Sequence, residues 1–138
     1  MGMNKLAGIS DEDIQWANDF AKEKYAGADM GQQDAARHMA LGWLASQSER
    51  DPEAPSPNAL LLIQGREIVD FKPLSAGMDR HNNKVGYNMG LLASDKDQAA
   101  EMIFMHLDGT EGIGLDDELP EQSRAVFYKS DEAKKIKY

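Results

Sequence analysis

Hydrophobic residues recur with a helical period along most of the first hundred positions of the chain. In residues 11–25 one face is apolar and the opposite face is polar, which is typical of an amphipathic surface helix. Its apolar positions are Ile14, Ala17, Phe20, Ala21 and Tyr25. Residues 33–47 are apolar on nearly every face, so the pattern predicts a helix at the centre of the fold.

Two further helices are predicted at 79–93 and 95–107. The segment 59–71 fits either a helix over about 58–70 or a short hairpin around Gln64-Gly65. We expect the helix, because Ser56-Pro57 is a typical start signal. Residues 108–121 are predicted to form an acidic, glycine-rich loop, and a short strand or helix is expected near 124–129. The pattern therefore predicts an all-α fold, one domain over 1–138 with about five helices and a motif-bearing core at about 34–93.

Composition narrows the classes of function. A chain of 138 residues is about one domain, and the absence of cysteine excludes disulfides and thiolate metal sites. The formal net charge of −9 disfavours nucleic-acid binding. No stretch approaches the roughly 20 apolar residues of a membrane span, and no signal-peptide pattern is found at the start. We therefore expect a protein of the cytoplasm of the producing cell, unless it is delivered elsewhere.

Two polar groups are predicted to face each other across neighbouring helices. Asp34, Arg37 and His38 share roughly a 100° arc of the predicted central helix. Asp79, Asn82 and Asn83 begin a similar arc on the 79–93 helix, which continues through Gly86, Gly90 and Ala93. Glycines four apart allow another backbone to approach closely, and the central helix offers Ala40, Gly42 and Ala45. We expect the two faces to pack together and to bring the two polar groups into contact.

This arrangement suits general acid–base hydrolysis, with His38 as the proton carrier, Asp34 or Asp79 orienting it, and Arg37 stabilising an oxyanion. The candidate catalytic residues are thus His38, Arg37, Asp79 and Asp34. His81, Asn82, Asn83 and Glu67 are candidate ligand-binding residues. Asp34, Glu67 and Asp79 are the carboxylates that a glycosidase reaction would use. The alternative interpretation is a buried hydrogen-bond network with no catalytic role.

Metal and cofactor sites are not expected from the sequence. The chain has no HExxH motif and no tight histidine spacing, and the acidic run at 108–118 lacks the EF-hand alternation. Phosphate-binding and dinucleotide-binding glycine motifs are missing too. His81 is expected to point away from Asp79 unless the helix begins near Asn82, and His106 is predicted to be a core histidine.

The segments DAARHMALGWLA and MDRHNNKVGYNMG resemble an uncharacterised family of small helical domains found in bacterial toxin-like and phage proteins. That family combines an RHxxxxW-type helix with an MDxHNNxxG helix. The resemblance covers about residues 34–93 and implies a shared site. Its positions here are Arg37, His38, Asp79, His81, Asn82, Asn83 and Gly86. The aromatic residue of the first motif is displaced to Trp43, and a family His-Glu pair is replaced by Arg66-Glu67.

These observations together predict a small bacterial or phage effector-type domain, with a hydrolase of a cell-envelope polymer or a phosphoester as the enzymatic hypothesis. Such a protein would meet its envelope-derived substrate or a protein partner after delivery with a phage particle or a secretion system. The alternative is a non-enzymatic binding, virion or secretion module. A third hypothesis, an acidic mimic of nucleic acid, rests on the net charge alone.

Overall fold

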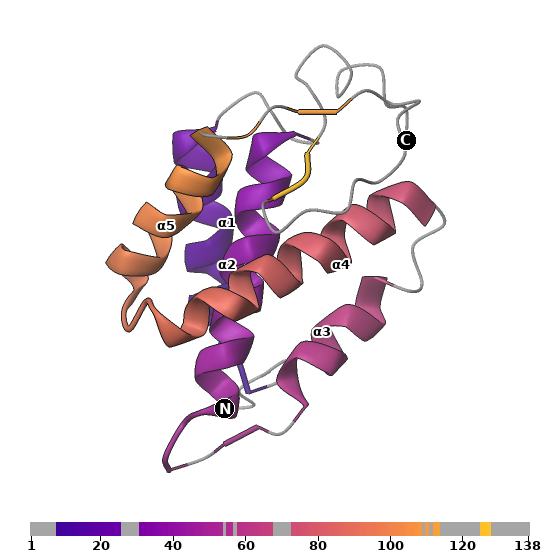
Figure 1. Cartoon of the computed structure of the whole chain (residues 1–138). Coiled ribbons are helices and arrows are strands. Elements are labelled where there is room, and N and C mark those ends of the chain that lie inside the picture. The colour runs from indigo at the N-terminus through magenta and orange to yellow at the C-terminus, as the bar shows by residue number, and fades with distance from the viewer. Residues whose placement is uncertain are drawn as a thin grey trace.

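Helices dominate the regular structure that the computed structural model describes (Figure 1). In chain order they are α1 (Asp11–Lys24), α2 (Gln32–Glu49), α3 (Ala59–Glu67), α4 (Pro73–Asn88), the 3-10 helix η1 (Met89–Leu91) and α5 (Lys96–Asp108). The structure describes residues 8–25, 31–53, 55–56, 58–67, 73–108, Thr110, 112–113 and 125–127, without the side chains of 64–67 and 73–76. Within these ranges there is no sheet, so the predicted all-α class is confirmed.

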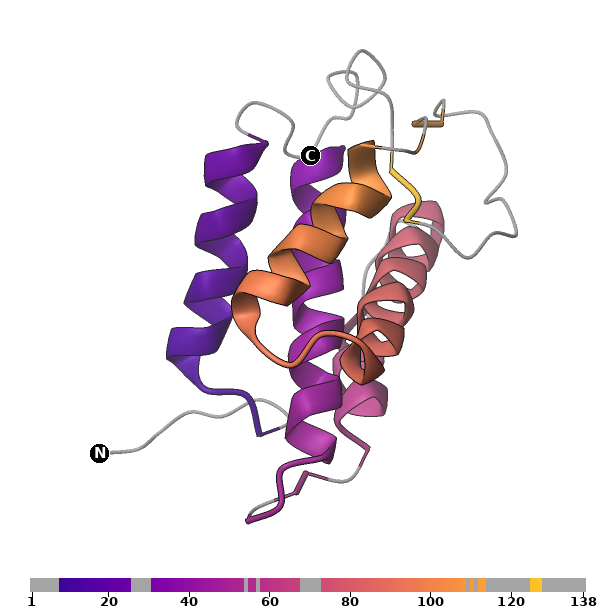
Figure 2. The ribbon, with the colours of Figure 1, turned by 60° about the vertical axis from the view of Figure 1, so that its left-hand side comes forward.

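Helix α2 lies at the centre, as predicted, and contacts every other α-helix. Helices α1 and α5 cover one side of it, whereas α4 crosses its other side with α3 alongside (Figures 1 and 2). Ten of its eighteen residues are buried. This central position explains why α2 lacks the polar face that α1 has.

The observed helix ends agree with some predictions and correct others. Helix α1 begins at Asp11, as predicted, and the Ser10 hydroxyl accepts a hydrogen bond from the Asp13 N–H at 3.2 Å. Segment 59–67 is helical, so the hairpin alternative is wrong. Its first helical residue is Ala59, after Asn58 in the left-handed region at φ 64°. The interior of the predicted 108–121 loop and most of 124–129 lie outside the described residues.

Helix α4 begins six residues earlier than predicted, at Pro73 rather than Asp79. Proline suits the first turn of a helix because its missing N–H would have no partner there. The predicted start at Asp79 was wrong because it gave weight to Pro73 and Gly77 as helix breakers and not to this positional preference. Asp79 consequently lies inside a regular helix and is not an N-cap.

The contact between α2 and α4 is a direct approach of two backbones. A β-carbon built on Gly42 would lie 1.8 Å from the carbonyl oxygen of Asn83, and one built on Gly86 would lie 1.8 Å from that of Met39. Gly90, in η1, faces the Ser46 side chain instead of backbone. Because no side chain larger than hydrogen fits at Gly42 and Gly86, these two glycines set the separation of the helices.

The other side of α2 is covered by an aromatic cluster from α1 and α5. Trp16 stacks on Phe20 at 5.0 Å between centroids, and Phe104 of α5 contacts both Phe20 and Tyr25. Tyr25 is buried, and its burial together with the nearby Asp108 carboxylate raises the pKa of its hydroxyl to about 12. None of the described helices is both long and apolar enough to cross a membrane.

The first prediction concerns the α2–α4 contact. Gly86→Ala is expected to lower the free energy of unfolding by about 2–3 kcal/mol, because the added methyl meets backbone that cannot rotate away. Lys84→Ala, at an exposed position of the same helix, is the matched control and should change little. Chemical denaturation measures both, and equal effects of the two substitutions would contradict the close approach.

The second prediction concerns Tyr25. Its pKa in the folded state, about 12, exceeds the ordinary value of 10.0, so the folded chain holds this proton more tightly than the unfolded chain does. The resulting stability is fully present below pH 10 and is lost as the pH rises through 12. The wild-type chain should therefore lose more unfolding free energy over this interval than Tyr25→Phe does, as measured by denaturation at each pH. Parallel losses in both proteins would refute the assignment.

Candidate functional site

His38 occupies the buried face of α2, one turn after Asp34, and is only 5% exposed. Its position follows from the α2–α4 contact, because Gly42 lies one turn further along the same helix and draws α4 close. A buried imidazole requires partners for its two ring nitrogens. The structure supplies them from both helices.

The Nδ1 atom of His38 lies 3.0 Å from the side-chain oxygen of Asn83, which is completely buried. An amide oxygen only accepts hydrogen bonds, so Nδ1 carries the hydrogen and donates it. In a neutral imidazole this tautomer leaves the lone pair on Nε2. Asn83 thus fixes both the orientation of the ring and the atom that is able to accept a proton or bind an ion.

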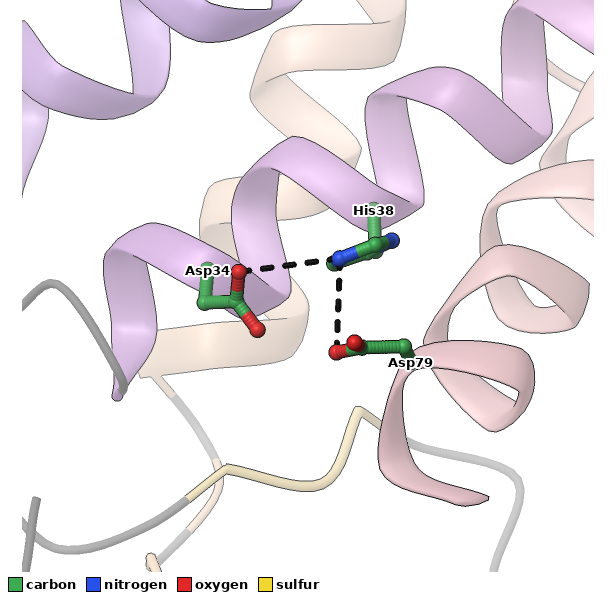
Figure 3. A group of neighbouring side chains, drawn as sticks. All are labelled: Asp34, His38 and Asp79. Atoms are coloured by element: carbon green, nitrogen blue, oxygen red, sulfur yellow. Dashed lines mark ion pairs between the residues drawn. The ribbon is translucent and has the colours of Figure 1, made fainter. Parts of the chain in front are cut away.

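Two carboxylates face Nε2 (Figure 3). Its distance is 3.3 Å to Oδ1 of Asp79 on α4 and 3.6 Å to Oδ1 of Asp34 on α2. Each carboxylate side chain is 13% exposed, whereas that of His38 is 6% exposed. Two acids therefore converge on one imidazole nitrogen at the boundary between core and solvent.

Arg37 adds a positive charge at this boundary. Its Nη2 atom donates to Oδ1 of Asp34 and lies 3.5 Å from Nε2 of His38. The Arg37 side chain is 43% exposed, so the guanidinium spans the distance from the buried cluster to the surface. Asp34 is held between this guanidinium and the imidazole.

Asn82 faces a different neighbour from Asn83. Its amide nitrogen donates to the carbonyl of Val126 at 2.7 Å, and its amide oxygen accepts from the Val126 N–H at 2.8 Å. Residues 125–127 are buried, and the Phe127 carbonyl accepts a hydrogen bond from the Ile113 N–H at 2.8 Å. The Asn82 side chain therefore pairs with the backbone as a neighbouring strand would, and holds this segment against α4.

A polar hollow of about 280 Å³ lies between α1 and α2 beside the cluster. Asp34 and Arg37 line it from α2, and α1 contributes polar side chains that include Lys22. The remaining lining residues are Gln15, Asn18, Asp19, Ala21 and Gln33. Two members of the cluster are thus reachable from an open cavity, whereas His38, Asn82 and Asn83 are closed off.

The structure brings together Asp34, Arg37, His38, Asp79 and Asn83 of the residues predicted for the site. Asn82 adjoins them but binds backbone. His81 is half-buried and does not belong to the Asp34–His38–Asp79 group, in keeping with a regular helix through Asp79. The Glu67 side chain lies outside the described residues. Val126 and the α1 side of the hollow were not predicted, since no local pattern in the sequence links either to residues 34–38.

Comparison with known proteins gave no match to a family model, a curated protein or a solved structure.

The third prediction concerns Asn82. Asn82→Ala leaves the N–H and the carbonyl of Val126 without these partners in a buried setting, and should lower the unfolding free energy by about 2–3 kcal/mol. Amide hydrogen exchange at Val126 should accelerate more than exchange in α2. Asn88→Ala, at an exposed position of the same helix, provides the control. Unchanged protection of Val126 in Asn82→Ala would contradict the pairing.

Proposed function

We propose that the chain is a hydrolase whose site is the Asp34–His38–Asp79 group with Arg37, and that its substrates are phosphoesters. The observation that supports this proposal most is the position of His38 Nε2, which lies 3.3 Å from the Asp79 carboxylate and 3.6 Å from that of Asp34, and Asp34 lines the polar hollow together with Arg37. A base fixed by a hydrogen bond on its other nitrogen is the usual arrangement for proton transfer.

The reaction follows from the placement of these groups. A water molecule that donates one hydrogen bond to the Asp34 carboxylate and the other to Nε2 of His38 gives its proton to Nε2 as its oxygen attacks phosphorus. The ester P–O bond breaks, and the alcohol leaves with the proton returned from the imidazolium. The negative charge that builds up on the phosphoryl oxygens is stabilised by the Arg37 guanidinium.

Two cationic side chains of the hollow offer contacts to an anionic substrate. Arg37 and Lys22 line it beside the carboxylates of Asp19 and Asp34, and a guanidinium binds a phosphate through two parallel hydrogen bonds. A glycosidase would use two carboxylates, and Asp34 and Asp79 are the pair that the described residues offer. A cell-envelope polymer with phosphodiester links would carry the negative charge that Arg37 and Lys22 bind, and it fits the predicted cell-envelope substrate.

The resemblance to bacterial toxin-like and phage domains supports an effector-type role, in which the chain reaches such a polymer after delivery by a secretion system or a phage particle. The rival proposal is a binding or virion module in which the cluster is structural. The near-complete burial of His38, Asn82 and Asn83 favours this rival.

The fourth prediction separates the two proposals. His38→Gln should lower the rate of hydrolysis of bis(4-nitrophenyl) phosphate by about 10²–10⁴-fold, the usual contribution of a general base. His81→Gln on α4 is the matched histidine control and should retain the wild-type rate. Circular dichroism and thermal unfolding of each variant establish that the loss is not one of folding.

Two outcomes would count against the hydrolase. One is a folded His38→Gln variant with wild-type activity. The other is a wild-type chain inactive on phosphodiesters, on phosphomonoesters and on isolated envelope polymer, combined with strong destabilisation by His38→Gln. The second outcome would favour the structural module.

A further inference from the structure

We propose that Asp34, His38 and Asp79 bind a divalent cation of the Zn²⁺ type, with Asn83 as the outer partner of the histidine. The inference uses the side chains of the proposed function but gives His38 a different part, that of a metal ligand. Its readout is cation binding and not hydrolysis.

The spacing of the three ligand atoms fits one ion. A tetrahedral ion with bonds of about 2.0–2.2 Å to nitrogen and oxygen separates its ligand atoms by about 3.3–3.6 Å. Nε2 of His38 lies 3.3 Å from Oδ1 of Asp79 and 3.6 Å from Oδ1 of Asp34, and all three ligand atoms lie within 4.8 Å of one another. Each carboxylate side chain is 13% exposed, which leaves it room to adjust to an ion.

The hydrogen bond from His38 to Asn83 is the second observation. Histidines that bind metals donate the hydrogen of their other ring nitrogen to a carboxylate, a carbonyl or water, which fixes the tautomer and the ring plane. The amide oxygen of Asn83, 3.0 Å from Nδ1, serves that purpose here. It leaves Nε2 as the ring atom that would bind the ion, on the side where the carboxylates lie (Figure 3).

A cationic nitrogen already lies beside these ligands. Nη2 of Arg37 contacts Asp34 and lies 3.5 Å from Nε2 of His38. The guanidinium thus partly neutralises the two carboxylates, and an entering ion would displace it. Because Arg37 is 43% exposed, its side chain is able to swing outward into the hollow that it lines.

The ligand set also indicates the class of ion. One imidazole and two carboxylates suit a first-row divalent ion better than calcium, which prefers six to eight oxygen ligands. Three protein ligands leave a fourth position for water, as in catalytic zinc sites. A bound ion of this kind would acidify that water, so His38 would then hold the ion instead of accepting the proton. The sequence predicted that these side chains meet across the two helices, but it predicted no metal site, because no metal-binding motif joins them.

The fifth prediction tests this inference on the full chain prepared without a histidine tag. Titration with Zn²⁺ by calorimetry should show one saturable site, and Zn²⁺ should raise the temperature of unfolding. Co²⁺ should develop the visible absorption of a tetrahedral nitrogen–oxygen site, which Zn²⁺ should abolish. Asp79→Asn and His38→Gln should remove this site, whereas Asp97→Asn and His81→Gln should not.

Two more variants test the neighbours of the ion. Asn83→Ala should weaken Zn²⁺ affinity by about 10–100-fold, the usual effect of removing an outer partner. Arg37→Gln should strengthen it, since the competing cation is gone. Because Arg37 is half-exposed, this variant is expected to fold even if those at buried positions do not.

The inference would be overturned if the wild-type chain bound neither ion, or if Asp79→Asn and Asp97→Asn bound Zn²⁺ alike. A weaker affinity in Arg37→Gln would also contradict it. Zn²⁺ binding without hydrolysis would leave this inference standing and remove the proposed function. Hydrolysis that depends on His38 and persists in EDTA, with no detectable Zn²⁺ binding, would support the proposed function and overturn this inference.

Discussion

The structure depends on the point where α2 and α4 touch through backbone alone. Gly42 and Gly86 each face a main-chain carbonyl of the other helix, and any β-carbon there would force the helices apart. Asn83, whose carbonyl faces Gly42, also supplies the amide oxygen that binds His38. Asn83 therefore takes part in both the packing contact and the polar cluster. Because the glycines set the distance between the helices, they also determine the geometry of the cluster.

The cluster balances its charges locally. The carboxylates of Asp79 and Asp34 lie 3.3 Å and 3.6 Å from Nε2 of His38, and in this partly buried setting they would repel each other. The imidazole of His38 contacts both carboxylates, and the Arg37 guanidinium contacts that of Asp34. Arg37 extends to the surface, whereas His38 is held from behind by Asn83. A substrate anion or a metal ion would change this balance in opposite ways, the first by engaging Arg37 and the second by displacing it.

The sequence predicted the helices, whose formation depends on local residue patterns, and the face of α4 that packs on α2, which depends on the spacing of its glycines. The amphipathic face of α1, the central position of α2 and the row of small residues through Gly86 and Gly90 all follow from periodicity and residue size. The beginning of α4 was missed because Pro73 and Gly77 resemble a loop in isolation, and only the tertiary context decides between a loop and a helix there. The pairing of Asn82 with Val126 spans 44 positions in sequence, and no local pattern encodes it.

The tautomer of His38 provides the most direct test of the α2–α4 contact. The hydrogen of the neutral ring lies on Nδ1 only if Asn83 of α4 is in contact with it. Two-dimensional ¹⁵N NMR of the imidazole distinguishes a hydrogen on Nδ1 from one on Nε2. This account predicts that the neutral ring of His38 carries a slowly exchanging hydrogen on Nδ1, and that Asn83→Ala releases it. A neutral ring with its hydrogen on Nε2, or an Nδ1 signal indifferent to Asn83→Ala, would contradict the account.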